Sequence, residues 1–444
     1  MRSYSRKKSL APKLGLLLSI LVAVALIVGA FSYFRDTDGP QITLMAESER
    51  VSAKPLTFEL SDKGSGLRNA TITLTQGNIS RTILDTTYEP GVTRSSETIA
   101  LQDPALRDGP IEVRVIATDR SIYRFGAGNT SDQVFHLIFD ATPPRINVLS
   151  TAHNINQGGA ALIVYTVSEE VKRTGMEVGD YFFPGFRQPS GEYLALFALP
   201  HDMSPAEFSP RLIAVDLAGN EGRGGFSHHA NARRFRHDNL NISDNFLNAV
   251  MPQFERYFPN ADSLLETFLK VNTQMREDNR QTLNELSRNT ASEPLWRGDF
   301  LRMAGAANMA GYADRRTYLY QGRKISEATH MGIDLASVQQ APIHASNHGR
   351  VIFAEFLGIY GNCVVIDHGL GLQSLYAHLT RMEVSPGDFV QKGDLIGNSG
   401  ATGMALGDHL HFEIMVGGVP VNPIEWWDPN WVRNNITSKL PSAP

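Results

Sequence analysis

Residues 409–413 read His409-Leu410-His411-Phe412-Glu413, and this stretch decides the fold of the C-terminal part of the chain. Polar and apolar residues alternate, which is typical of a β-strand with one face in a core. Leu410 and Phe412 would point into that core, while the two histidines and Glu413 would share the opposite face. Neighbouring imidazoles indicate either a metal site or a solvated surface. The strand alone leaves both interpretations open.

The sequence around this strand continues the same pattern. Short strand-like runs alternate with turns that contain glycine, and the runs span 350–353, 363–366, 373–376 and 411–416. The pattern predicts a compact, mostly antiparallel β-domain at residues 291–430. The chain's single cysteine, Cys363, lies in one of the runs, so we expect it to be a buried apolar side chain without a catalytic role.

A second motif, His330-Met331-Gly332-Ile333-Asp334, precedes this region. Its glycine and its β-type neighbours predict a bent strand or loop, in which Gly332 lets the chain turn and bring His330 and Asp334 together. Imidazole and carboxylate are suitable ligands for zinc. Taken alone, the spacing is a weak signal, and a chance occurrence of the two residues is the better interpretation.

A third motif places His378 in Leu375-Tyr376-Ala377-His378-Leu379, where strand alternation predicts that Tyr376 and His378 share a face. The three motifs together supply four histidines and one aspartate. A catalytic zinc ion uses three protein ligands and keeps one position open for water, which leaves two histidines for proton transfer. The spacing does not decide whether His409 or His411 is the ligand. A His-Glu-x-x-His motif is absent, so histidine would replace the glutamate base.

Residues 312–427 resemble the zinc endopeptidases of the lysostaphin/LytM type, which act on bacterial cell walls. The resemblance rests on the three histidine motifs in their expected order. It also rests on the run 384–393 and on the short motifs Ile396-Gly397, Gly400-Ala401-Thr402-Gly403 and Val421-Asn422-Pro423.

The resemblance implies that His330, Asp334 and His411 hold one Zn²⁺ ion. It implies that His378 and His409 lie at the open face of the ion and act on the attacking water and on the tetrahedral intermediate. Behind these residues we expect Glu413 and Tyr376 to be supporting partners of the site.

The implied activity is hydrolysis of the peptide cross-links of peptidoglycan. The alternative is an envelope protein without hydrolytic activity that activates or organises other wall hydrolases. All five chemical positions are occupied, which favours the enzyme. The sequence leaves open whether the bond lies between D-Ala and a diamino acid or within a glycine bridge.

An uncharged stretch at residues 14–34 follows several basic residues. Its length predicts a transmembrane helix, with residues 1–13 in the cytoplasm and the remaining chain exported across the cell (inner) membrane. A cleaved signal peptide is the alternative, although a signal has a shorter apolar region.

Two stretches of about 100 residues come next, at 39–141 and 142–235, and we expect both to be immunoglobulin-like β-sandwiches. Val115-Ile116-Ala117-Thr118-Asp119 in the first is echoed by Leu212-Ile213-Ala214-Val215-Asp216 in the second. They would act as spacers or as a docking surface for an envelope partner. Residues 240–290 read as a helical connector, either a passive linker or a regulator of access to the site, and residues 431–444 read as a tail.

The overall prediction is a multidomain, mainly β protein with one N-terminal transmembrane helix. The net charge is -5, and no basic block occurs beyond the extreme N-terminus. Nucleic acid is therefore not an expected partner, because phosphate binding needs concentrated Lys and Arg.

Overall fold

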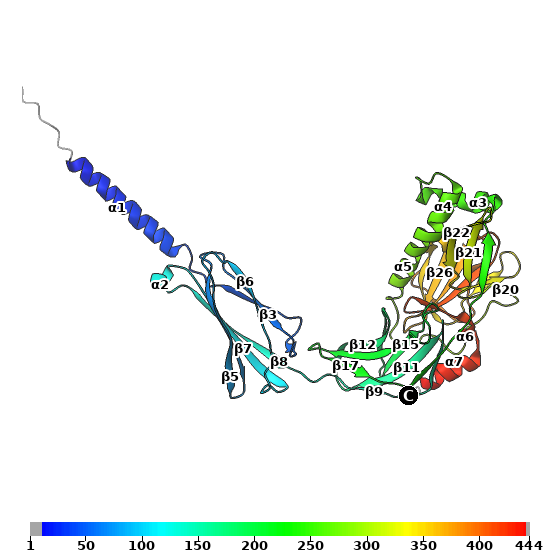
Figure 1. The fold of residues 1–444 in the computed structure, drawn as a ribbon, viewed down its shortest axis with the longest axis horizontal. Coiled ribbons are helices and arrows are strands. Elements are labelled where there is room, and N and C mark those ends of the chain that lie inside the picture. Colours follow the sequence, from blue (N-terminus) through cyan, green and yellow to red (C-terminus); the bar gives the residue numbers. More distant parts are fainter. Residues whose placement is uncertain (1–10, 441–444) are drawn as a thin grey trace, which may run out of the picture. The chain divides into compact units, whose positions relative to one another are not determined.

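The computed structural model describes residues 11–440 and is mainly β (Figure 1). Most of the predicted cytoplasmic tail and the last residues of the predicted C-terminal tail, 1–10 and 441–444, lie outside the described residues. The chain forms two compact units. Unit 1 is residues 1–143 with 217–220, and unit 2 is residues 144–216 with 221–444.

The first unit begins with the helix α1 (Ala11–Phe34). Its segment Gly15–Tyr33 has a mean hydropathy of 2.6 and none of it is buried. The helix is therefore long and apolar enough to cross a membrane, as expected from its sequence. Both a membrane anchor and a signal sequence have this character.

Two sheets complete the first unit. One contains β1 (Gln41–Met45), β3 (Leu56–Ser61) and β6 (Arg94–Ile99), and the other contains β2 (Arg50–Val51), β8 (Thr130–Phe139), β7 (Gly109–Asp119), β4 (Leu67–Gln76) and β5 (Ile79–Thr87). A short helical turn, α2 (Tyr123–Gly126), lies between β7 and β8. Phe58, Leu67 and Val113 share one core between the sheets. The assignment to the immunoglobulin-like class stays a prediction.

Residues 144–216 and 221–231 also form paired sheets, within the second unit. Their strands are β9 (Ile146–Val148), β11 (Ala160–Val167), β15 (Tyr193–Ala198) and β14 (Phe186–Arg187) in one sheet, and β13 (Tyr181–Pro184), β12 (Val171–Val178), β16 (Arg211–Asp216) and β17 (Glu221–Gly224) in the other, with β10 (His153–Asn156) beside β18 (His228–Asn231). Phe197 and Leu212 belong to the same hydrophobic core as Phe412 and Trp426 of the C-terminal region. This module and the C-terminal region are thus continuous in packing.

The C-terminal region is built on one large sheet. Its strands are, in order, β20 (Ala307–Ala310), β23 (Ile333–Ala336), β31 (Leu410–Val416), β27 (Leu372–Leu379), β26 (Asn362–Asp367), β25 (Gly349–Phe356) and β29 (Phe389–Val390), with β32 (Val419–Val421) paired to β31. All of these pairings are antiparallel, as predicted.

Two smaller sheets and a set of short helices surround this sheet. The sheets are β24 (Pro342–His344) with β30 (Leu395–Asn398) and β28 (Arg381–Met382), and β19 (His237–Asn241) with β21 (Arg315–Tyr320) and β22 (Arg323–Thr329). The chain also forms η3 (Gly358–Tyr360), α6 (Pro423–Trp427), α7 (Pro429–Asn435) and η4 (Thr437–Lys439). Val432 and Ile436 are buried, so residues 431–440 of the predicted tail pack into the core.

The predicted helical connector packs on the large sheet. It comprises α3 (Asp244–Val250), η1 (Met251–Tyr257), α4 (Leu264–Lys270), η2 (Val271–Met275) and α5 (Arg276–Leu286), which Figure 1 shows in green. Ser263 caps α4 by accepting a hydrogen bond from the backbone of Glu266. Phe268 and Leu283 share a core with Leu375 and Met415 of the sheet. The helices thus cover one of its faces.

Candidate active site

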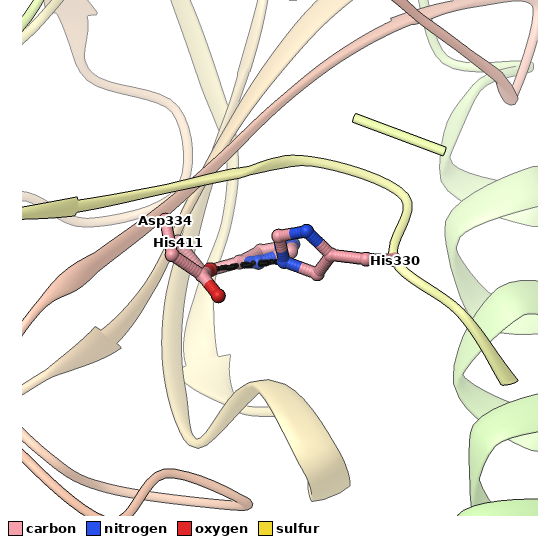
Figure 2. Close-up of side chains that lie close together, drawn as sticks. All are labelled: His330, Asp334 and His411. Carbon is pink, nitrogen blue, oxygen red and sulfur yellow. Dashed lines mark hydrogen bonds and ion pairs between the residues drawn. The ribbon is translucent and has the colours of Figure 1, made fainter. Parts of the chain in front are cut away.

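Three side chains converge at the edge where β23 meets β31 (Figure 2). His330 lies between β22 and β23, in a non-helical segment as predicted, and Asp334 and His411 face each other across the two strands. His330 Nε2, Asp334 Oδ1 and His411 Nδ1 lie 2.9 Å from one another in all three pairings. These residues form a group that could hold a metal ion.

The hydrogen bonds around the two imidazoles decide which of their nitrogens face the group. His330 Nδ1 donates to the carbonyl of Gly311 at 2.8 Å, and His411 Nε2 donates to Glu413 Oε1 at 2.9 Å. When both rings are neutral, the remaining nitrogens present lone pairs to the Asp334 carboxylate. Three acceptors without a proton between them repel one another, whereas a divalent cation would attract all three. Ligands of a tetrahedral zinc ion lie roughly 3.3 Å apart, so the group has a suitable size.

Gly332 allows the two strands to approach at this point. A Cβ atom on Gly332 would lie 2.5 Å from the carbonyl oxygen of Phe412 and 2.8 Å from His411 Nε2. The chain bends at Gly332 and His330 and Asp334 converge, as predicted, although the φ of Gly332 is not positive. The glycine is needed because backbone and side chains of β31 occupy the space that any side chain would take.

His378 and His409 lie beside the group. The ring of His378 is 4.8 Å from that of His409 and 5.8 Å from that of His411, and His409 Nε2 is 3.6 Å from Asp334 Oδ1. His378 Nδ1 donates to the carbonyl of Thr402 and His409 Nδ1 donates to that of Gly407, both at 2.8 Å. Each ring in its neutral form therefore keeps Nε2 free to accept a proton or hydrogen bond. All five residues singled out from the sequence thus meet at one place.

Residues 328–423 match the sequence model of Peptidase family M23. The chain carries a peptidase M23 domain. The resemblance to the lysostaphin/LytM type that its sequence motifs indicated is confirmed.

Two curated relatives match this domain. They are the DD-carboxypeptidase/endopeptidase Mpg of Neisseria meningitidis, 44% identical over 95 residues, or 21% of this chain and 22% of the relative, and the peptidoglycan DD-endopeptidase ShyA of Vibrio cholerae, 40% identical over 98 residues, or 22% and 23%. The matched segment therefore spans less than a quarter of either relative. Among solved structures, the catalytic domain of lysostaphin from Staphylococcus simulans is 27% identical and covers 28% of this chain and 92% of that chain, with a TM-score of 0.24.

Tyr376 lies on the opposite face of the M23 sheet. Its cross-strand partner is Phe412, and its hydroxyl group bonds to Ser346 and Ser374. His378 has a left-handed backbone, with φ of 63°, and this conformation breaks the strand alternation. The prediction that Tyr376 and His378 share a face is therefore wrong, and the structure does not bring Tyr376 to the site.

Glu413 reaches the site from the far side of His411. Its side chain is fully buried, and Oε1 accepts hydrogen bonds from His411 Nε2 and from the Tyr360 hydroxyl, both at 2.9 Å. Oε2 pairs with Arg280 Nη2 of α5 at 3.0 Å. On the other side of the group, Arg316 Nη2 lies 3.3 Å from Asp334 Oδ2. Tyr360 and both arginines were not expected from the sequence, because no local pattern connects them with the histidine motifs.

Burial and these contacts set the charges of the M23 site. Burial, together with the neighbouring His409 and His411, lowers the pKa of His378 to about 3, so this imidazole is neutral at pH 7. Burial alone would raise the pKa of Glu413, but Arg280 and His411 outweigh it and lower the pKa to about 2. Burial would likewise lower the pKa of His411, but Asp334 and Glu413 raise it to about 9. The carboxylates thus make His411 strongly basic, so it holds a second proton at pH 7 in the absence of a metal, and a metal ion would displace that proton from Nδ1.

The site opens into a cleft of about 180 Å³. The other side chains that line this cleft are mainly basic, aromatic and apolar, and they include Arg276, Arg316, Tyr318, Met331, Tyr360, Met404 and Leu406. Leu406 is 68% exposed at its rim. The cleft therefore offers cationic and apolar contacts to a peptide that reaches the histidines.

Proposed function

We propose that this chain is a zinc-dependent endopeptidase that hydrolyses peptide cross-links of bacterial peptidoglycan. The observation that carries the proposal is the group of three acceptors 2.9 Å apart with two further histidines beside it, inside an M23 domain. The names of the relatives, peptidoglycan DD-endopeptidase and DD-carboxypeptidase/endopeptidase, support a DD-peptide bond of the wall as the substrate.

His330, Asp334 and His411 would hold the zinc ion. Zinc bound there supplies Lewis acidity and makes a water molecule acidic enough to attack a peptide carbonyl near neutral pH. The carboxylate of Asp334 is oriented by Arg316, and the imidazole of His411 by Glu413. These contacts limit the rotation of the ligands before the ion arrives.

His378 and His409 would carry out the proton transfers. The neutral His378 can accept a proton from the attacking water through Nε2, because its Nδ1–H is held by the carbonyl of Thr402. His409 has an 18% exposed side chain, so its Nε2 lies where a bound peptide would pass. Together they would stabilise the tetrahedral intermediate and return a proton to the leaving amine.

We further propose that α1 is an uncleaved anchor in the inner membrane and that the remaining chain is exported. The length and hydropathy of Gly15–Tyr33 support this reading. Residues 39–141 and 142–235 would then be immunoglobulin-like modules that act as spacers or dock an envelope partner. Residues 291–430 would be the catalytic part.

The test uses the full-length protein in detergent with zinc and purified peptidoglycan, and mass spectrometry of the released muropeptides. Cleaved cross-links are expected, and His411→Ala should release none. A folded, zinc-loaded protein that leaves the cross-links intact would refute the activity. If that protein instead stimulated a separate wall hydrolase, an organising role in the envelope would replace it.

A further inference from the structure

Arg280 is a largely buried cation in α5, a helix of mainly polar residues. Its side chain is 15% exposed, and Nη2 lies 3.0 Å from Oε2 of the fully buried Glu413. In the described part of the chain, its Nε and Nη1 atoms are buried without a hydrogen-bond partner. The guanidinium also lies 5.8 Å from the centre of the Tyr360 ring. Glu413 is therefore the main hydrogen-bonding partner of Arg280.

Stability alone does not explain this ion pair. Removing two charges from water is costly, and unpaired donors on the guanidinium add to the cost. Two apolar side chains of similar volume would pack here at least as favourably, because Leu375, Ala377 and Met415 already form an apolar core on this face of the sheet. The effect of the two charges on their neighbours is the better explanation.

The neighbour of Glu413 is the metal-facing histidine. Glu413 Oε1 accepts a hydrogen bond from His411 Nε2, and His411 Nδ1 lies 2.9 Å from both His330 Nε2 and Asp334 Oδ1. A charged carboxylate at Nε2 fixes the tautomer and the ring orientation, and it makes Nδ1 a stronger donor to a metal. Among the ion pairs of residues 11–440, only that with Arg280 brings an arginine or lysine to Glu413.

We propose that Arg280 is a positioning residue of the metal site. It holds the Glu413 carboxylate in place, Glu413 fixes His411, and α5 thereby completes the site instead of only linking two parts of the chain. The inference rests on the proposed function, because it takes the group at His411 to hold zinc. It gives the helical segment 240–290 a specific role that its sequence did not reveal.

The test compares three variants of the full-length protein for zinc affinity, measured by competition with a chelating dye, and for the absorption spectrum of bound Co²⁺. Arg280→Met should bind zinc about 10- to 100-fold more weakly and alter the cobalt spectrum. Arg280→Lys, which keeps the charge, should recover part of the affinity. Arg288→Met is the matched control, since Arg288 is exposed just beyond α5, and it should behave as the wild type.

A double variant separates positioning from folding. Arg280→Met combined with Glu413→Gln removes both charges, so its melting temperature should rise above that of Arg280→Met. Its zinc affinity should stay low, because the acceptor at His411 Nε2 is no longer charged. Recovery of wild-type affinity and cobalt spectrum in the double variant would show that the pair serves folding only, and would overturn the inference.

The two proposals fail in different ways. A wild-type protein that binds no zinc refutes the proposed function. A wild-type protein that binds zinc, with Arg280→Met binding it equally well, refutes only the role of Arg280.

Discussion

The two faces of β31 are formed by alternating residues of one strand, and they need different kinds of contact when they are buried. Leu410, Phe412 and Ile414 enter an apolar core, where contact with other apolar side chains suffices. His411 and Glu413 are equally buried, at 5% and 0% exposure, but each of their polar atoms needs a partner. The partners come from β23, η3 and α5. The polar face therefore requires more of the chain to be in place than the apolar face does.

The substitution expected to disrupt the polar face most is His411→Ala. Loss of one of three ligands should abolish zinc binding and reduce peptidoglycan hydrolysis to background, while the apolar face keeps the domain folded. Zinc content and muropeptide release measure both effects. Removal of zinc with a chelator should give the same loss, and added zinc should reverse it in the wild type but not in the variant.

Removing either His378 or His409 should impair catalysis without impairing metal binding. His378→Ala and His409→Ala should each lower kcat/KM about 100- to 10,000-fold, the range for loss of an acid–base group. Zinc content should stay at the wild-type level, because neither residue belongs to the group of three. Equal loss of zinc in either variant would reassign that residue to the ligands.

The apolar face is broken by Phe412→Ala. Loss of this ring should reduce the free energy of unfolding by about 3–5 kcal/mol. Phe412 is 2% exposed and stacks on Trp427 with ring centroids 5.4 Å apart. Denaturant unfolding measures the change. The zinc content of the folded fraction should be unchanged, so a parallel loss of zinc affinity would mean that the two faces are not independent.

Lowering the pH should destabilise the protein through His368, which lies on the apolar side of the sheet. His368 is buried against Phe300, and burial lowers its pKa to about 4. In the unfolded chain its pKa is about 6.5, so below that pH the unfolded state binds a proton that the folded state does not. Stability is therefore full above pH 6.5 and falls by about 3 kcal/mol as the pH drops to 4. Unfolding curves should show that the free energy of unfolding of His368→Gln falls less steeply with decreasing pH than that of the wild type. An equally steep fall would mean that protonation of His368 does not cause the loss of stability.

The contact between β23 and β31 gives the smallest expected effect. Gly332→Ala places a Cβ against the Phe412 carbonyl, so the strands must separate slightly, at a cost of about 1–3 kcal/mol. Zinc affinity should fall together with stability, because His330 and Asp334 flank the glycine. Gly407→Ala is the control, since a Cβ there would meet open space. Unaltered zinc affinity in Gly332→Ala would show that the close approach is dispensable.

Much of the M23 domain is determined by its sequence alone. Strand alternation is local, so it placed Leu410 and Phe412 in the core and His411 with Glu413 on the other face. Turn signals and apolar runs predicted the antiparallel sheet and the burial of Cys363. The motifs also singled out the five residues that meet in the cleft.

Other features depend on the tertiary structure. Strand alternation predicted that His378 and Tyr376 share a face. The left-handed backbone at His378 instead directs its side chain to the site, on the face opposite to Tyr376. Gly332 serves a close approach to a strand about eighty positions away, which a local turn rule does not describe. The packing of residues 144–216 into the core of the C-terminal region is likewise a long-range property.

The contact of Arg280 with Glu413 joins residues 133 positions apart. The sequence determined that α5 is a polar helix and that Glu413 shares a face with His411. It could not determine that the helix lies on that face, because polar residues in a helix read as solvated until a partner is known. Only the fold brings the guanidinium and the carboxylate together away from water, where a charge must be matched by another.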